Sequence, residues 1–312
     1  GSSKRHVGAP RESCDASAGQ MPHAPRCLAC VGAAIASWRS LPARLQGLAI
    51  EALGSQERAE RLFDNDLVCY RALNKSARLC CLRGDDIIAE LWQDGFPSTV
   101  YGTWRLQTSP AGSVIFDVGS NIGAVSIFLH RSNPAHCIYA FEPVPLTHLL
   151  LMVNLHLNGV AVLGEAEGCS FGGVVVMRRA LTGTGRPVDM LVPPATDARS
   201  KNSALEGTAL DDDHSQDAWP RLRVESVELG AFIRDRGIRR VELLKLDCEG
   251  CEFEVVPAML RSGLQAAVKF FAGEVHPWQP RGVPEADIFL TCAFLSSRDD
   301  WRYFSKAGGM CL

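Results

Sequence analysis

The chain has 312 residues and a formal net charge of −3, from 32 lysines and arginines and 35 aspartates and glutamates. This balance argues against a nucleic-acid-binding protein, which needs a concentrated basic face. No apolar run approaches the roughly 20 residues that a membrane-spanning helix requires, so we expect no membrane span. The length predicts one large α/β domain with a smaller appendage.

Residues 1–26 are rich in serine, alanine, proline and charged residues, a composition typical of a disordered tail. The apolar run at 27–38 fits either a buried helix or the central part of a signal peptide, and its late start favours the buried helix. We therefore expect a cytoplasmic protein, with an N-terminal targeting segment as the alternative.

Residues 27–97 are expected to form a helical cap beside the main domain. Apolar residues recur at helical spacing between Pro42 and Gly54, which suit the start and the end of a helix. Ser55 can cap the next helix, and Asp85 can cap a later one.

The chain has 12 cysteines, which are scattered rather than arranged as a small disulfide scaffold. Cys137, Cys248 and Cys292 lie inside apolar segments, where a reduced thiol behaves as a small hydrophobic side chain. The adjacent Cys80 and Cys81 suggest no disulfide framework either. We therefore expect reduced cysteines that contribute to packing.

The main domain is expected over residues 98–312, where apolar, β-branched runs alternate with helical stretches. This alternation is typical of an α/β fold with a largely parallel sheet that has helices on both faces. In such sheets ligands bind at the carboxyl ends of the strands. The runs expected as strands are 113–119, 136–142, 174–181, 241–247, 266–276 and 301–306, and the helices are 121–130 and 145–159.

Two segments of the main domain have the composition of loops. Residues 193–220 are long enough to form a lid or substrate loop rather than a plain connection. The insertion at 164–173 is glycine-rich, and we expect it to be flexible.

The first two strand ends indicate a nucleotide-like cofactor. One strand ends at Asp117 and leads into a turn with Gly119 and Gly123, and the next ends at Glu142, where a carboxylate can bind ribose hydroxyls. A dinucleotide needs a G-x-G-x-x-G turn, whereas the spacing here is G-x-x-x-G without lysine or arginine. Asp117 would repel a pyrophosphate. It suits S-adenosylmethionine (SAM), which has an amino group, a sulfonium and a ribose but no phosphate.

Charged residues also mark two later strand ends. The run at 243–252 places Lys245, Asp247 and Glu249 on one side of an extended chain. Such groups are costly in a buried strand unless they are paired or functional. One interpretation is that Lys245 neutralises the carboxylates and Glu249 caps the following helix; the other is a functional site. The next strand adds two more ionisable residues, Glu274 and His276.

These motifs resemble, in order and spacing, those of the FkbM-type methyltransferases, which are SAM-dependent O-methyltransferases. The likeness runs from about residue 98 to residue 306, and the K-x-D-x-E-G-x-E element at 245–252 is its most specific part. The resemblance implies a Rossmann-like class I methyltransferase sheet. It implies methyl transfer from SAM to a hydroxyl of a sugar, glycolipid or related small molecule.

The resemblance also implies roles for individual residues. Glu142 would hold the ribose, Ala180 would lie where the adenine pocket begins, and Asp247 would face the amino or methyl end of the cofactor. The residues expected to line the methionine end are Asp117, Gly119, Ser120, Asn121 and Gly123.

The sequence departs from the family pattern in several places. Arg178 and Arg179 stand where small or amide residues are usual, which puts the adenine contacts in doubt, and the insertion at 164–173 is unusual. The ending A-G-G-M-C-L leaves little room for the last strand pair of a seven-stranded sheet. The helical segment before residue 98 resembles no motif that we can name.

Three candidates emerge for the chemistry of methyl transfer. His276 is the first candidate for the base that accepts the proton of the acceptor hydroxyl, because imidazole is neutral near pH 7. Glu249 is the second candidate, and Lys245 is expected to orient the carboxylates. A rival mechanism has Asp247, Glu274 and His276 hold a divalent metal. Two other functions stay open: a catalytically inactive binding protein with this fold, and an NAD-dependent oxidoreductase.

Overall fold

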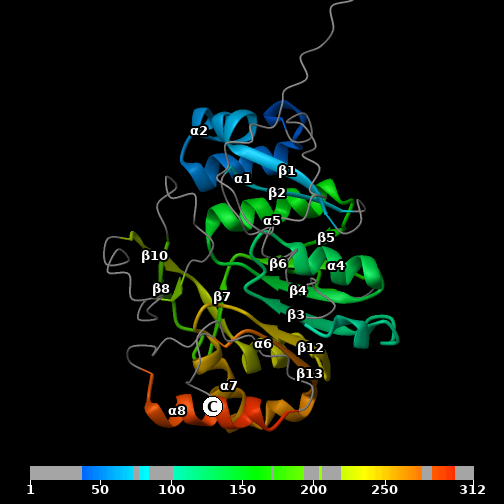
Figure 1. Cartoon of the computed structure of the whole chain (residues 1–312), viewed down its shortest axis with the longest axis vertical. Helices are drawn as coiled ribbons and strands as arrows, with labels where there is room; N and C mark the ends of the chain where they lie inside the picture. Colours follow the sequence, from blue (N-terminus) through cyan, green and yellow to red (C-terminus); the bar gives the residue numbers. More distant parts are fainter. Residues whose placement is uncertain are drawn as a thin grey trace, which may run out of the picture.

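A six-stranded sheet forms the centre of the computed structural model, which describes residues 37–72, 77–83, 101–169, 172–192, 204–205, 219–275 and 283–298 (Figure 1). The strand order is β13-β12-β3-β4-β6-β5, and every neighbouring pair is parallel. The strands are β3 (Val114–Val118), β4 (Cys137–Phe141), β5 (Val162–Leu163), β6 (Gly173–Met177), β12 (Val241–Leu246) and β13 (Val268–Gly273).

Helices cover both faces of this sheet, as the alternation of successive side chains requires. Ile115 of β3 packs into an apolar cluster with residues of α4 and α5, whereas Phe116 and Val118 pack into a second cluster with residues of α6, α7 and α8. The helices are α4 (Ala124–Ser132), α5 (Pro145–Leu157), α6 (Leu229–Asp235), α7 (Glu252–Ser262) and α8 (Glu285–Ser296). The predicted α/β fold is confirmed.

The strand order reverses direction between β3 and β12. The chain moves from β3 to β4 and onward to the β5 edge, and it later returns to the other side of β3 as β12 and β13. Such a reversal leaves a crevice at the carboxyl ends of the two central strands, where ligands bind in open α/β sheets. Lys245 of β12 lies opposite Asp117 of β3 at this point.

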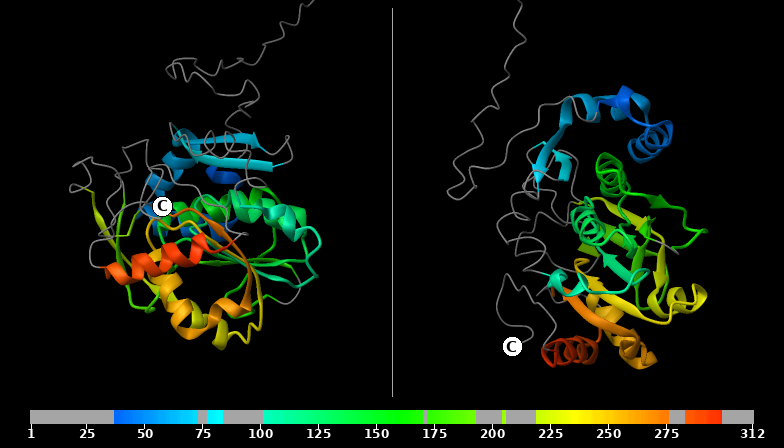
Figure 2. Two further views of the ribbon diagram at one scale, coloured as in Figure 1. Left: turned by 60° about the horizontal axis from the view of Figure 1, so that its bottom comes forward. Right: turned by 90° about the vertical axis from the view of Figure 1, so that its right-hand side faces the viewer.

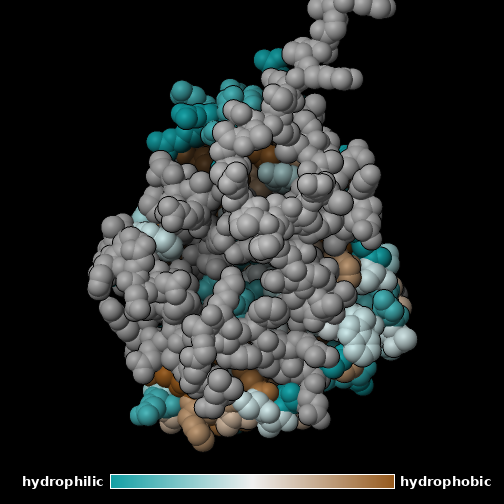
Figure 3. All heavy atoms as spheres, in the orientation of Figure 1, coloured by the Kyte–Doolittle hydropathy of each residue, from teal (hydrophilic) through white to brown (hydrophobic). Residues whose placement is uncertain are grey.

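The N-terminal helices form where the sequence predicts them. Helix α1 (Ala43–Leu53) ends at Gly54, which has φ 78°, and the Ser55 side chain accepts a hydrogen bond from the backbone N–H of Arg58 to cap α2 (Gln56–Arg61). Helix α1 packs beside α5 (Figure 2). The exposed side chains over α2 are hydrophilic (Figure 3).

The expectation of helix throughout residues 27–97 is wrong for residues 67–72 and 77–82. A π-helical turn, η3 (Leu62–Asp66), leads into β1 (Leu67–Ala72), which pairs antiparallel with β2 (Ala77–Leu82). A disulfide joins Cys69 to Cys80 across the hairpin, and side chains of α5 bind its backbone, so tertiary contacts override the helical spacing. The helix expected after Asp85, the tail 1–26 and most of the run at 27–38 lie outside the described residues.

The expectation of reduced cysteines is also wrong. Besides the hairpin pair, disulfides join Cys137 to Cys169 and Cys248 to Cys251, and Cys292 is disulfide-bonded as well. Cys137 lies on β4, and Cys169 precedes the adjacent strand β6, so the fold brings together residues that are 32 positions apart. Sequence pattern alone does not reveal such a pairing.

Smaller strands flank the main sheet. The expected strand 174–181 divides into β6 and β7 (Ala180–Thr182), and β7 pairs parallel with β11 (Ser226–Glu228). A second sheet joins β8 (Val188–Leu191) to β9 (Ala204–Leu205) and β10 (Arg221–Val224). Most of the expected loop 193–220 and all of 301–306 lie outside the described residues. Among the described helices, none combines the length and apolar character needed to cross a bilayer.

Candidate active site

The turn between β3 and α4 requires glycine at two positions. Gly119 has φ 73° and Gly123 has φ 87°, a region that favours residues without a Cβ. A Cβ on Gly119 would collide with the backbone oxygen of Asp247, and one on Gly123 would collide with the Leu151 side chain. The turn is therefore held closely between the end of β12 and helix α5.

Asp117 lies beneath this turn and is excluded from solvent. The Ser126 hydroxyl donates to Asp117 Oδ2 at 2.6 Å, and the Lys245 ammonium lies 3.2 Å from Asp117 Oδ1. The Ser120 hydroxyl donates to the Asp117 backbone oxygen at 2.6 Å. The negative charge of Asp117 is thus compensated inside the protein, and its carboxylate supports the turn from below.

Lys245 joins the two central strands where the strand order reverses. Its ammonium donates to the backbone oxygens of Val118 and Gly119, at 3.2 and 2.7 Å, and lies 3.5 Å from Asp247 Oδ2. Burial lowers the pKa of Lys245, but the carboxylates of Asp117 and Asp247 outweigh it and raise the pKa above its ordinary value. Lys245 is therefore a charged ammonium that forms ion pairs with both carboxylates, and of the carboxylates in its own run it pairs with Asp247.

Tyr101 is a site residue that the sequence did not reveal. It is buried just before a 3₁₀ turn, η4 (Thr103–Leu106), and its hydroxyl donates to Asp247 Oδ2 at 2.8 Å. Burial and the Asp247 carboxylate raise the pKa of Tyr101 well above its ordinary value, so the hydroxyl keeps its proton. The Asp247 side chain is 22% exposed, in contrast to the fully buried Asp117. Tyr101 fixes the orientation of the more accessible carboxylate.

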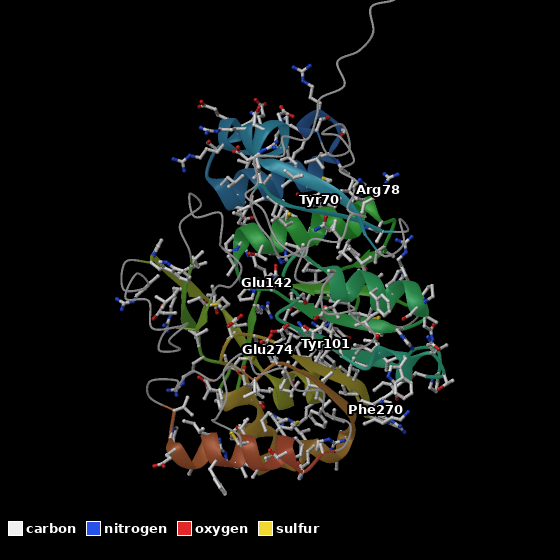
Figure 4. The ribbon with its side chains drawn as sticks, viewed as in Figure 1. Tyr70, Arg78, Tyr101, Glu142, Phe270 and Glu274 are labelled. Atoms are coloured by element: carbon white, nitrogen blue, oxygen red, sulfur yellow. A yellow bond between two sulfur atoms is a disulfide. The ribbon has the colours of Figure 1, made fainter. Side chains whose placement is uncertain are left out.

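Glu142 follows β4 and is buried beside the turn. Its Oε2 accepts from the backbone N–H of Asn121 at 3.0 Å, and its Oε1 accepts from the backbone N–H of Val144 at 3.1 Å. Burial raises the pKa of Glu142 to about 7, although both backbone N–H groups oppose the shift. Glu142, Tyr101 and Glu274 lie together in the middle of the molecule in Figure 4.

The segment after Asp247 does not form the expected helix cap. The N-cap position of α7 is Cys251, and the backbone N–H of Gly250 donates to Glu252 Oε2 at 3.1 Å. Glu249 is instead a buried residue with φ 54°, held in a tight turn between β12 and α7. The interpretation of Glu249 as the helix cap is therefore wrong.

After β13, the structure describes the chain as far as residue 275 and again from residue 283. Glu274 follows β13, where its backbone N–H donates to the oxygen of Leu246 at 2.9 Å, and its charge contributes to the raised pKa of Tyr101. His276 lies outside the described residues, so its role as the base stays a prediction. The same holds for the metal site that would need His276. Within the described part of the chain, the group spaced to hold a metal is Cys248, Cys251 and Glu252, but the two cysteines are joined in a disulfide and offer no thiolate ligand.

The region expected at the adenine end contains two ion pairs. Ala180 is buried at the start of β7. Arg178 pairs with Glu51 of α1 at 2.5 Å, and Arg179 pairs with Glu165 at 2.9 Å. The two arginines that depart from the family pattern therefore connect the rim of the sheet to neighbouring segments.

A comparison with known protein families finds a match over the part of the chain that contains the charged strand ends. Residues 117–298, more than half of the chain, match the methyltransferase FkbM domain. The chain belongs to the FkbM methyltransferase family. The match begins at Asp117 and includes the β12 motif, but the hairpin of β1 and β2 precedes it.

Three relatives are similar to this FkbM-family chain. One is 31-O-demethyl-FK506 methyltransferase FkbM of Streptomyces tacrolimicus, 30% identical over 195 residues, which is 60% of this chain and 74% of the relative. Methyltransferase sdnD of Sordaria araneosa is 27% identical over 249 residues, 73% of this chain and 86% of the relative. Methyltransferase 1 of Beauveria bassiana (strain ARSEF 2860) is 28% identical over 152 residues, 47% and 58% of the two chains. No solved structure matches this chain.

Proposed function

We propose that this FkbM-family protein transfers a methyl group from SAM to a hydroxyl oxygen of a sugar, glycolipid or related small molecule. The observation that carries the proposal is the cluster of Asp117, Lys245, Asp247 and Tyr101 at the reversal of strand order, beside Glu142. The Streptomyces relative, 31-O-demethyl-FK506 methyltransferase FkbM, has a name that puts the methyl group on an oxygen, which supports an oxygen acceptor here.

The residues around the crevice fit SAM better than a dinucleotide. The turn offers backbone and small side chains without a cation for a pyrophosphate, and the nearby Lys245 ammonium is already bound by two carboxylates. Glu142 can accept hydrogen bonds from ribose hydroxyls through the lone pairs that its two backbone donors leave. The partly exposed Asp247 carboxylate suits a cationic amino group.

In this proposal, each group of site residues has its own role. Gly119, Ser120, Asn121 and Gly123 would shape the wall along the methionine end, and Glu142 would bind the ribose. The resemblance assigns Asp117 to the methionine end, but because its carboxylate is buried against Ser126 and Lys245, it would instead support this wall together with Lys245 without touching the ligand. Ala180 would border the adenine. When bound, SAM supplies an electrophilic methyl group, and its alignment with the acceptor oxygen accounts for most of the rate.

A base near the acceptor would remove the hydroxyl proton as the new carbon–oxygen bond forms. His276 is the first candidate because it follows the last residue of β13 by three positions in the sequence and imidazole is neutral near pH 7. Glu249 is the second candidate, although its side chain is buried. If Asp247, Glu274 and His276 instead hold a metal, a chelator will abolish turnover and added Mg²⁺ will restore it.

An activity screen with methyl-labelled SAM and pooled sugars, glycolipids and polyketide-like alcohols tests this proposal. We expect label in an acid-stable ether product of at least one acceptor pool, with formation of S-adenosylhomocysteine in equal amount. Binding of SAM without transfer to any pool would favour the inactive binding protein. Hydride transfer with NAD would favour the oxidoreductase and contradict the proposal.

A further inference from the structure

Helix α5 binds the backbone of strand β2 through two asparagine side chains. Asn154 Oδ1 accepts from the N–H of Cys80 at 2.7 Å, and its Nδ2 donates to the Cys80 oxygen at 3.0 Å. Asn158 does the same with Arg78, at 2.9 and 2.6 Å. Figure 1 shows β2 running beside α5, and Arg78 is labelled in Figure 4.

The spacing of helix and strand explains this double contact. Residues four apart on a helix are about 6 Å apart along its axis, and residues two apart on a strand are separated by about 6.8 Å. In an antiparallel hairpin, every second residue directs its N–H and C=O away from the partner strand. Cys80 and Arg78 are two such residues, and the side-chain amides of Asn154 and Asn158 pair with them as a neighbouring strand would.

Asn154 makes a third contact that Asn158 does not share. Its Nδ2 also donates to the backbone oxygen of Ile122 at 2.8 Å, in the turn between β3 and α4. The Ile122 N–H in turn donates to Asn121 Oδ1 at 2.7 Å, and the Asn121 N–H donates to Glu142. A continuous hydrogen-bonded path therefore runs from the hairpin through Asn154 to the carboxylate expected to bind the ribose.

The surroundings make this path stiff. Asn154 is fully buried, and both hydrogens of its amide group are used, one by the hairpin and one by the turn. The disulfide between Cys69 and Cys80 fixes the hairpin at the residue that Asn154 binds. Asn121 has φ 49°, a conformation that a side chain other than glycine adopts at some cost and that neighbouring contacts must maintain.

We propose that Asn154 is a positioning residue for the cofactor site and that the hairpin of β1 and β2 is a working part of that site. The hairpin precedes the family-matched region, yet through Asn154 it holds the turn at Asn121 and Ile122 in the shape that presents the backbone to Glu142. This inference rests on the proposed binding of SAM in that turn.

The two asparagines provide a matched pair of variants in the full chain. Asn154→Leu removes the contacts to both the hairpin and the turn. Asn158→Leu removes the same kind of hairpin contact, and with it the bonds of Asn158 to the Asn154 backbone oxygen and to Arg131, but it leaves the contact between Asn154 and Ile122 intact. We expect Asn154→Leu to weaken the affinity for SAM and S-adenosylhomocysteine about 10-fold by calorimetry, which corresponds to about 1.4 kcal/mol. Asn158→Leu should lower the melting temperature but keep both affinities within about 2-fold.

A double-mutant cycle separates positioning from general stability. Asn154→Leu should cost less affinity in a Glu142→Ala background than in the wild type, because the path ends at Glu142. If Asn154→Leu does not fold, Asn154→Ser leaves room for water to pair with Cys80 and is measured instead. Equal affinities in wild type and a folded Asn154 variant would overturn the inference alone. A wild-type protein that binds neither ligand would overturn the proposed function and, with it, this role of Asn154.

Discussion

Lys245 and Asp117 face each other across the two central strands, with the ammonium 3.2 Å from the carboxylate and both side chains excluded from solvent. A buried pair of this kind stabilises a fold little by itself, but the loss of one partner leaves the other charge unpaired in the core. The pair therefore links β3 to β12 at the reversal of strand order, because either charge without the other would be left unpaired between the two strands.

Replacing the lysine should reveal this dependence. Lys245→Met should lower the free energy of unfolding by about 3–5 kcal/mol, since the Asp117 carboxylate remains buried. The double variant with Asp117→Asn removes both charges and should recover part of the loss. Urea unfolding of the three proteins measures the difference. A single variant as stable as the wild type would contradict the account of this pair.

The hydroxyl of Tyr101 should matter more for the ligand than for the fold. Tyr101→Phe keeps the ring, which lies 5.6 Å from the Lys245 ammonium, but removes the hydrogen bond to Asp247. A hydrogen bond to a charged group contributes about 1.5–3 kcal/mol, so we expect SAM affinity to fall at least 10-fold by calorimetry.

Tyr139→Phe is the control for this variant, because it also removes a tyrosine hydroxyl, but from another part of the fold. It is buried on β4, and its ring stacks on Phe116 away from the carboxylates of the site. Tyr139→Phe should leave SAM affinity unchanged. If both variants lose affinity equally, the hydroxyl of Tyr101 has no special role in orienting Asp247.

The pKa of Glu142 predicts a dependence on pH. Folding raises this pKa from 4.5 to about 7, so the folded state favours the protonated form. The contribution of Glu142 to stability is therefore present below its unfolded pKa and is lost as the pH rises through about 7, a loss of about 3 kcal/mol. Ribose hydroxyls bind the ionised form, so SAM affinity should increase from about pH 6 to about pH 8 with release of protons.

Calorimetry in buffers of different ionisation enthalpy measures this proton release. Glu142→Gln cannot ionise, and its affinity for SAM should be weaker and independent of pH over the same range. A wild-type affinity that stays constant from about pH 6 to about pH 8 would remove Glu142 from the ribose site.

The base is tested by a separate variant. His276→Ala should retain SAM affinity, whereas kcat should fall about 10²–10⁴-fold. At saturating SAM, wild-type activity should rise with pH through an ionisation near 6 to 7, the range of imidazole, and this rise should vanish in the variant. Glu249→Gln serves as the comparison. A folded, SAM-binding His276 variant with a wild-type rate would eliminate this residue, and Glu249 would become the candidate.

The sequence predicted the strands and helix boundaries that depend on residues close to one another in the chain. The apolar runs that became β3, β4, β12 and β13 are long enough to specify buried strands, and the capping residues Gly54 and Ser55 mark real helix boundaries. One of the two interpretations of the β12 run had Lys245 pair with neighbouring carboxylates, and the structure shows such a pair with Asp247.

Contacts between distant residues explain what the sequence could not provide. Tyr101 and Asp247 are separated by 146 positions, and no local sequence pattern indicates that the two residues are in contact. The hairpin has helix-forming residues in both strands, and its partner Asn154 is 74 positions from Cys80. The disulfides Cys69–Cys80 and Cys137–Cys169 depend in the same way on which strands become neighbours, whereas Cys248–Cys251 is a local pair three positions apart that we did not predict.

Binding of SAM is the central claim, and thermal unfolding with SAM, S-adenosylhomocysteine and NAD side by side tests it most directly. A ligand at 100 times its Kd stabilises the folded protein by about 2.7 kcal/mol, so SAM and S-adenosylhomocysteine should each raise the Tm clearly. NAD should leave it unchanged. A rise with NAD alone, or with none of the three in a folded protein, would contradict the account.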